Sequence, residues 1–292
     1  MESLPRALVL GVAAPVVAAT AALWVLWRRD SMDPRVRERW TIVVLALIFS
    51  GAWVAGFGVP WPVRSGRDWM LPMTLGGAAL ALLGTFAAGH VAIAAGWVLR
   101  AGVLVGGMYL IARTRLASGW ALGEALPLMA GFAAAGLAAG WSLGRAGREA
   151  GGLTPILAVL AVSMTSAVAA LTGNITQAIQ PAILCAVVGP ALLVSVRRPG
   201  VALGDGASWG GAFLAGAWFS TSALGETPWL LNALAAGSVV LVGVSGLGAM
   251  GRLRGVKAWI VRGVVVGTPG VAAVAWAGYR VWEASRDAGY DY

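Results

Sequence analysis

The stretch MLPMTLGGAALALLGTFAAGHVAIAAGWVLRAGVLVGGMYLIA, residues 70–112, decides how this chain folds. It is almost free of polar side chains, and as one helix its 43 residues would extend for roughly 64 Å at about 1.5 Å per residue. The hydrocarbon core of a bilayer is only about 30 Å thick. We therefore expect a hairpin of two helices, over 70–88 and 91–112, that is divided at Gly89-His90.

The composition of the whole chain explains why a bilayer is the relevant solvent. Of 292 residues, 59% are hydrophobic and only 11% are charged, and the mean hydropathy is +0.81. Soluble proteins carry about 25% charged residues, because their surface must face water. The 42 glycines also fit a membrane, since small residues let transmembrane helices approach closely. The composition predicts an all-α, polytopic membrane helix bundle.

Apolar runs elsewhere in the chain complete the predicted map. About 20 apolar residues are enough for one crossing, and ten such segments are present: 5–27, 40–60, 70–88, 91–112, 121–143, 153–172, 178–196, 209–224, 229–250 and 261–282. Nine crossings is the alternative, if 70–112 crosses once. The short loops leave no room for a soluble domain. We expect one transmembrane domain over 1–292, with pseudo-halves 1–147 and 148–292 divided near the polar segment GRAGREAGG.

The distribution of basic residues favours ten crossings. The net charge is +9, but the cations are scattered in short clusters, whereas a nucleic-acid-binding protein gathers them on one face. With the N-terminus outside, 13 basic residues lie in the inner segments 28–39, 144–152, 197–208 and 251–262, and seven lie outside. A single crossing of 70–112 would change these numbers to 9 and 11. The positive-inside rule thus predicts both termini outside the cytosol of a bacterial inner membrane.

Tryptophans support this map, because an indole ring prefers the headgroup level of a bilayer. Of 15 tryptophans, most lie at or near the ends of the proposed spans, and Trp209 is one of these. Trp53, Trp97, Trp218 and Trp276 lie deeper. We expect these four to be packing or cavity residues.

A polar interruption, TGNITQAIQP at 172–181, has two interpretations. Ser163, Ser166, Asn174 and Gln177 share one broad face of a helix, and Gln180 widens that face. Broken helices with such side chains line cavities in transporters, so the face could be a neutral binding site. Alternatively, the stretch is a short outer turn whose amides face water or cap helix ends.

Two ionisable residues fall in or beside the hairpin. Arg100 lies about nine residues into the span 91–112, where a charge costs about 2.5–3.5 kcal/mol on insertion scales. It must therefore snorkel, pair with an acid, or face an aqueous cavity as an anion anchor. His90, the one histidine, titrates near neutrality and could be a proton site, or it could simply be solvated at the hairpin turn.

Enzymatic chemistry finds little support. GVSGLGAMG, 243–251, places Ser245 in a G-x-S-G segment that resembles the neighbourhood of the nucleophile in rhomboid-type intramembrane proteases. Such a serine needs a base, but His90 is far upstream and Lys257 lies in an inner loop. Close helix packing is the simpler interpretation. Cys185 is the one cysteine, which excludes an intrachain disulfide. We expect no catalytic residue, cofactor or metal.

Two functional hypotheses follow from the sequence. The first is a small carrier or permease for a neutral or amphipathic solute, with a cavity formed by Arg100, Ser163, Ser166, Asn174, Gln177 and Gln180. The second is a non-catalytic assembly or scaffold subunit of a larger membrane complex. Gly136, Gly140 and Gly144, spaced four residues apart, favour the second, because small-residue stripes mediate helix association. Expected partners are the lipid bilayer, a small solute, and a second copy or a membrane-complex partner, without nucleic acid.

Overall fold

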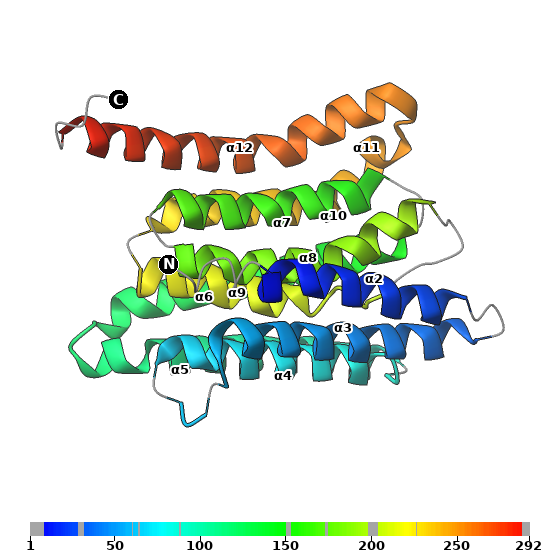
Figure 1. Cartoon of the computed structure of the whole chain (residues 1–292), viewed down its shortest axis with the longest axis horizontal. Coiled ribbons are helices and arrows are strands. Elements are labelled where there is room, and N and C mark those ends of the chain that lie inside the picture. Colours follow the sequence, from blue (N-terminus) through cyan, green and yellow to red (C-terminus); the bar gives the residue numbers. More distant parts are fainter. Residues whose placement is uncertain are drawn as a thin grey trace.

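The computed structural model describes residues 9–28, 32–59, 61–63, 65–87, 89–149, 153–172, 175–197, 204–225 and 227–287, and within these ranges it contains helices and turns but no strand. Each of the ten predicted segments contains a helix, although not all are long enough to cross a membrane (Figure 1). In chain order the elements are η1 (Val9–Ala13), α2 (Ala14–Trp27), α3 (Pro34–Phe57), η2 (Gly66–Trp69), α4 (Met70–Gly84), α5 (His90–Ala117), α6 (Leu122–Arg148), α7 (Leu153–Leu171), α8 (Ile175–Arg197), α9 (Gly210–Ala223), α10 (Trp229–Ser245), α11 (Gly248–Arg252) and α12 (Gly255–Asp287).

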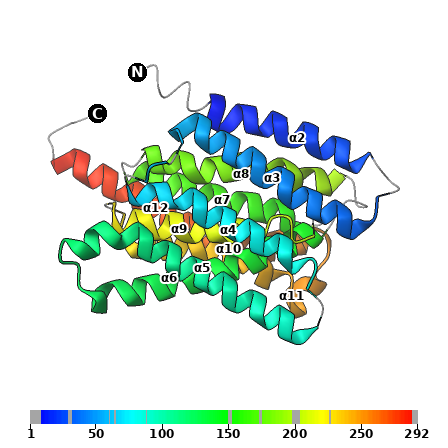
Figure 2. The ribbon, with the colours of Figure 1, turned by 90° about the horizontal axis from the view of Figure 1, so that it is seen from below.

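The hairpin expected over 70–112 is confirmed. α4 ends at Gly84 and α5 begins at His90. Gly89 between them has a φ of +88°, a left-handed conformation that glycine adopts without steric cost, so the chain can reverse there. α4 and α5 pack against each other, and α6 follows α5 in a second hairpin (Figure 2). α5 continues beyond the predicted end to Ala117, through a last stretch that carries Arg113 and Arg115.

Length and composition support an all-α, multi-pass membrane bundle. Six segments are long and apolar enough to cross a membrane, namely Val9–Trp27, Pro34–Phe57, His90–Ala117, Leu122–Arg148, Leu153–Leu171 and Gly255–Asp287, and two shorter apolar ones are Gln177–Leu193 and Trp229–Ser245. α4 and α9 have 15 and 14 residues, fewer than the about 20 that a crossing needs.

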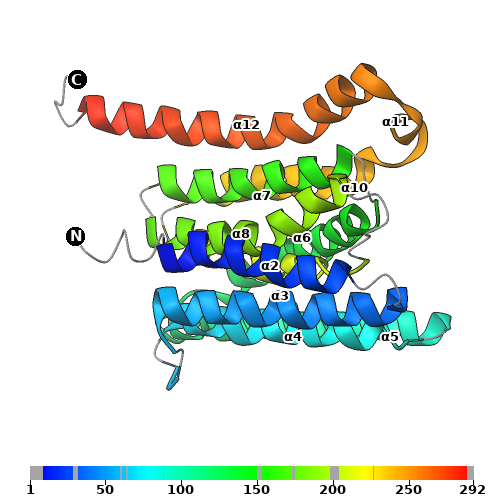
Figure 3. The ribbon, with the colours of Figure 1, turned by 45° about the vertical axis from the view of Figure 1, so that its right-hand side comes forward.

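α9 lies at the centre of the bundle, which explains how so short a helix is accommodated. All helices run along one axis; α12 is outermost over α7 and α10, whereas α3, α4 and α5 lie on the far side (Figures 1 and 3). α9 contacts α4, α5, α6, α8 and α10, and every residue in it except Ala212 and Ser222 is buried. Its aromatic side chains Phe213, Trp218 and Phe219 fill the core, so α9 faces protein rather than lipid.

The glycine stripe of α6 packs inside the chain. A Cβ on Gly140 would lie 2.8 Å from the carbonyl oxygen of Ser208, and one on Gly144 would lie 2.7 Å from a carboxylate oxygen of Asp205. Gly136 approaches α9 in the same way, 3.0 Å from the carbonyl oxygen of Gly211. The stripe expected to favour an assembly partner is therefore covered by α9 and by the turn that precedes it.

Successive helices are antiparallel, so the basic residues of 35–39, 145–148 and 252–257 lie at one end of the bundle, whereas Arg113 and Arg115 lie at the other. We define the basic end by the described segments 32–39, 85–87, 145–149, 204–208 and 246–257. Contacts between these segments hold it together: Arg39 Nε donates to Thr85 Oγ1 at 3.0 Å, and an Arg145 guanidinium nitrogen donates to the Gly246 carbonyl at 2.9 Å. At the opposite end, the hydroxyls of Thr172 and Thr227 are 2.8 Å apart.

Candidate functional site

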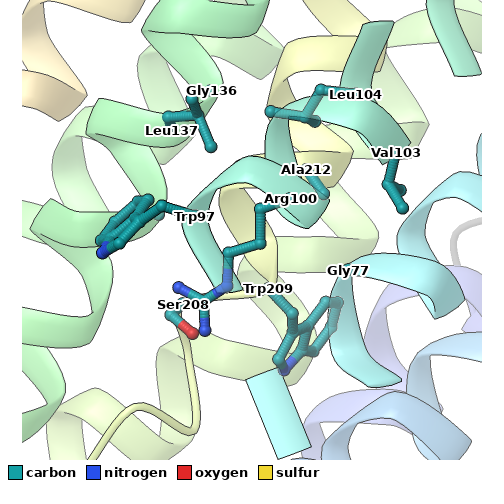
Figure 4. Close-up of a pocket in the computed structure, with 11 residues that line it drawn as sticks. Gly77, Trp97, Arg100, Val103, Leu104, Gly136, Leu137, Ser208, Trp209 and Ala212 are labelled. Carbon is teal, nitrogen blue, oxygen red and sulfur yellow. The ribbon is translucent and has the colours of Figure 1, made fainter. Parts of the chain in front are cut away.

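A polar cavity opens at the basic end between α4, α5, α6 and the turn 204–209. Its outer part has a volume of about 360 Å³ and is lined by Arg148 and Asp205 as well as by apolar side chains. Its inner part, about 30 Å³, is closed by Trp209 and shares Trp97, Arg100 and Ser208 with the outer part (Figure 4). About 10–15 Å³ of such space holds one water molecule, so the inner part has room for about two water-sized atoms.

Small residues keep this space open. Gly84 of α4, Gly96 of α5 and Gly140 of α6 line the outer part, and Gly77 and Gly136 line the inner part. A Cβ on Gly96 would meet no atom within 4 Å, so the cavity begins directly at its backbone. A larger side chain at Gly96 would fill this space, and a Cβ on Gly84 would lie 3.4 Å from an Arg100 guanidinium nitrogen, whereas Gly77, Gly136 and Gly140 allow close approach of the neighbouring chain.

Arg100 is the central residue of the cavity and is half-buried. Its guanidinium lies 5.2 Å from the centre of the Trp97 ring, but it forms no hydrogen bond or ion pair with any residue that the structure describes. A cation–π contact contributes about 0.5–1 kcal/mol at an exposed site, less than the about 2.5–3.5 kcal/mol that a charge costs within a membrane helix. The site therefore offers a positive charge to an acceptor.

Two further donors share the cavity with Arg100. The side chains of Ser208 and Trp209 are 7% and 2% exposed, and neither the hydroxyl nor the indole Nε1 has a hydrogen-bond partner among the described residues. Leaving a buried donor unsatisfied costs about 1–3 kcal/mol. Figure 4 shows the guanidinium of Arg100 turned toward Ser208. Together the three groups could donate to the oxygen atoms of one acceptor-rich group.

The sequence did not identify Ser208 and Trp209 as site residues. Trp209 does lie at the end of α9, as expected, but its indole is buried rather than placed at a membrane surface. The reason is its tertiary contact with Phe49, whose ring centre is 5.5 Å away. A serine and a tryptophan among glycines, GDGASWGG, is a weak signal, because nothing local reveals that Arg100 faces them.

The mouth of the cavity is held by an ion pair. Arg148 donates to a carboxylate oxygen of Asp205 at 2.6 Å, and the side chains are 63% and 32% exposed. The backbone N–H of Asp205 in turn donates to the carboxylate of Glu38 on α3. Gly204, with a φ of +57°, permits the tight turn. These contacts place Asp205, the one acidic residue among the described lining residues, beside the entrance.

A second polar network at the basic end is fully paired. Arg262 of α12 is only 7% exposed; its Nε donates to Ser245 Oγ at 3.3 Å, and its guanidinium also contacts Thr154 and lies 3.9 Å from Glu149. Glu149 pairs with Arg145 as well. Buried charges are tolerated when they are paired and hydrogen-bonded, so this network joins α6, α7, α10 and α12 as a structural contact.

Ser245 therefore has a structural partner rather than a base. Its hydroxyl donates to the Val242 carbonyl at 2.8 Å and accepts from Arg262. A guanidinium stays protonated in proteins and cannot accept a proton. Among the described contacts of Ser245 there is thus no group that could activate it as a nucleophile. The described residues also contain no group of three or more His, Cys, Asp and Glu that could hold a metal ion.

The serines of the predicted polar face line a different groove, between α2, α7 and α8. Ser163 Oγ donates to the Val159 carbonyl at 2.8 Å and lies 3.3 Å from Cys185 Sγ, and Ser166 Oγ donates to the Ala178 carbonyl at 2.7 Å. Their hydroxyls are thus engaged with backbone groups of their own helix pair. The structure does not bring them together with Arg100.

The other predicted site residues are also apart from the Arg100 cavity. Gln177 and Gln180 lie in the first two turns of α8, at the opposite end of the bundle, and Gln180 is 1% exposed with no partner for its amide among the described residues. Asn174 lies outside the described residues. His90, the first residue of α5, is exposed at the basic end and does not line the cavity.

Comparison of the chain with protein-family models, with curated proteins and with solved structures found no match. Function is therefore inferred from the residues of this chain. The cavity combines two arginines and two buried neutral donors with apolar walls, and this arrangement suits recognition of an acceptor-rich group better than bond cleavage.

Proposed function

We propose that this protein is a small membrane carrier that binds an amphipathic solute through an acidic head group in the Arg100 cavity. The observation that carries the proposal is the unpaired guanidinium of Arg100, set beside two buried donors without described partners. An ionisable residue within a membrane helix marks a functional site by default, because its cost must be offset. Of the two solute classes expected from the sequence, neutral and amphipathic, this chemistry favours the amphipathic one.

The proposed topology has ten crossings, with both termini outside the cytosol and the basic end inside. Its support is the antiparallel order of the helices together with the positive-inside rule, applied to the basic clusters of 28–39, 144–152 and 251–262. In this topology the short helices α4 and α9 are two of the ten crossings. In this orientation the solute enters the cavity at the level of the cytosolic leaflet.

The scaffold alternative loses its main support. Gly136, Gly140 and Gly144 were the features that favoured an assembly partner, and they are occupied by α9 and the turn 204–209. Purification in mild detergent distinguishes the two functions. We expect a stable lone monomer or homodimer, whereas a stoichiometric partner protein would favour the scaffold.

Transport by the reconstituted protein tests the proposal directly. Liposomes with wild-type protein should take up labelled short-chain alkyl carboxylates or alkyl phosphates faster than empty liposomes. Arg100→Met should lose this uptake, because hydrogen bonds to charged groups contribute about 1.5–3 kcal/mol, equivalent to roughly 10- to 150-fold in affinity. Arg113→Met is the matched control, since Arg113 is exposed on the same helix, away from the cavity. Wild-type uptake equal to that of empty liposomes across the panel would contradict the carrier function.

A further inference from the structure

The charged groups of the cavity are unevenly matched. Arg100 and Arg148 supply two positive charges, and Asp205 supplies the one negative charge among the described lining residues. Ser208 and Trp209 add neutral donors on the inner side. The pair of Arg148 and Asp205 is balanced at the mouth, so the excess positive charge of the cavity belongs to Arg100.

An anionic ligand in the cavity would compete with the Asp205 carboxylate for Arg148. Its carboxylate is bound by Arg148 at the mouth, in a contact where both side chains keep access to solvent. Exposed ion pairs of this kind are weak. Phosphate and carboxylate groups can bind a guanidinium through two parallel hydrogen bonds, so an incoming head group can compete for Arg148.

The turn that carries Asp205 also carries the inner donors. Asp205, Ser208 and Trp209 lie within five residues, and the Ser208 N–H donates to the Asp205 carbonyl at 2.9 Å. Gly144 closes against Asp205 and Ser208 from α6. Release of the Asp205 carboxylate therefore acts on the same short segment that carries the Ser208 hydroxyl beside Arg100 and the Trp209 side chain in the cavity wall.

The walls beside the charged groups are apolar. Ile93 and Trp97 of α5 and Trp141 of α6 line the outer part of the cavity, and Ile93 and Trp141 are 52% and 37% exposed. On helices that face lipid, these side chains offer contact area to a hydrocarbon chain attached to the head group. A free inorganic ion would leave these contacts unused.

We propose that the cavity binds a single-headed anionic amphiphile, an alkyl phosphate or its lipid equivalent, and that its head group displaces the Asp205 carboxylate from Arg148. The displaced carboxylate makes Asp205 a built-in competitor, which sets the affinity of the site. The inference rests on the proposed function, because it uses the same cavity, but it adds a ligand class and a specific role for Asp205.

Calorimetric titration of the full chain in a maltoside detergent with octyl phosphate tests this proposal. Asp205→Asn keeps an acceptor for Arg148 but removes the competing charge, so octyl phosphate should bind about tenfold more tightly, equivalent to about 1.4 kcal/mol. If Asp205→Asn binds no more tightly than wild type while wild type still binds and transports, the exchange is refuted and the proposed function stands. If the wild-type protein neither binds octyl phosphate nor transports it, the exchange at Asp205 and the proposed carrier function are both refuted.

A cavity-filling pair provides a control that does not depend on charge. Gly96→Leu should abolish binding by filling the outer cavity, whereas Gly102→Leu on the same helix should leave it unchanged. A Cβ at either position meets nothing within 4 Å, and Gly102 does not line the cavity, so both variants should fold. Binding retained by Gly96→Leu would refute the location.

Two further probes identify the source of the head group. Inorganic phosphate should bind at least tenfold more weakly than octyl phosphate, and equal binding would overturn the amphiphile. In nanodiscs, phosphatidylglycerol should weaken octyl phosphate binding relative to phosphatidylcholine if a membrane lipid occupies the site. An unchanged affinity would instead assign the site to a soluble amphiphile and overturn the lipid equivalent.

Discussion

Gly140→Ala should destabilise the bundle, although alanine is the better helix former. Its Cβ would lie 2.8 Å from the carbonyl oxygen of Ser208, a backbone atom that no rotamer change can move. Overpacking of this kind costs about 1–3 kcal/mol, against a gain of about 1 kcal/mol for replacing glycine in a helix. We expect a net loss of about 0–2 kcal/mol in the free energy of unfolding.

Gly131→Ala on the same helix isolates the packing contribution. A Cβ there meets no atom within 4 Å, so the substitution should stabilise the protein by up to about 1 kcal/mol. Because the helix propensity gain is common to both variants, the difference between them equals the overpacking cost at Gly140. That difference should be about 1–3 kcal/mol.

Unfolding of both variants in detergent, followed by circular dichroism, measures this difference. For a chain of this size about 1 kcal/mol shifts the unfolding midpoint by roughly 2 °C, so Gly140→Ala should melt about 2–6 °C below Gly131→Ala. Equal midpoints would refute the packing of α6 against α9. If the midpoints are equal and Gly140→Ala also loses a co-purifying protein, the glycine stripe would bind a partner protein, as the scaffold hypothesis requires.

Three other outcomes are expected. In a Cys185→Ala background, an impermeant maleimide should label Ser118→Cys on intact cells but Leu247→Cys only after lysis, because they lie at opposite ends; the reverse pattern would invert the proposed topology. Arg262→Met should lower the free energy of unfolding by about 1–3 kcal/mol, since it leaves buried hydroxyls without their donor, and an unchanged melting midpoint would contradict this. Ser245 should remain unlabelled by a fluorophosphonate, because its described contacts include no base; labelling would restore the hydrolase hypothesis.

Local features of the sequence were enough to predict the helices. Apolar runs of about 20 residues predicted a helix in each of ten segments, of which six are long and apolar enough to cross a membrane, and the excess length of 70–112 together with Gly89 predicted the reversal into a hairpin. These properties depend on residues that are close together in the sequence, so they can be recognised without knowledge of the tertiary structure. The division into pseudo-halves 1–147 and 148–292 stays a prediction, because the described packing does not test it.

Only the tertiary structure decided which polar groups meet. Arg100 was recognisable as a costly charge, but its neighbours Ser208 and Trp209 are more than 100 positions away, and the expected neighbours Ser163 and Ser166 line another groove. A helical pattern shows which residues share a face but not which helix covers that face. The covering helix depends on the close packing of α6 against the glycine- and alanine-rich α9, a contact between distant segments that no local pattern encodes.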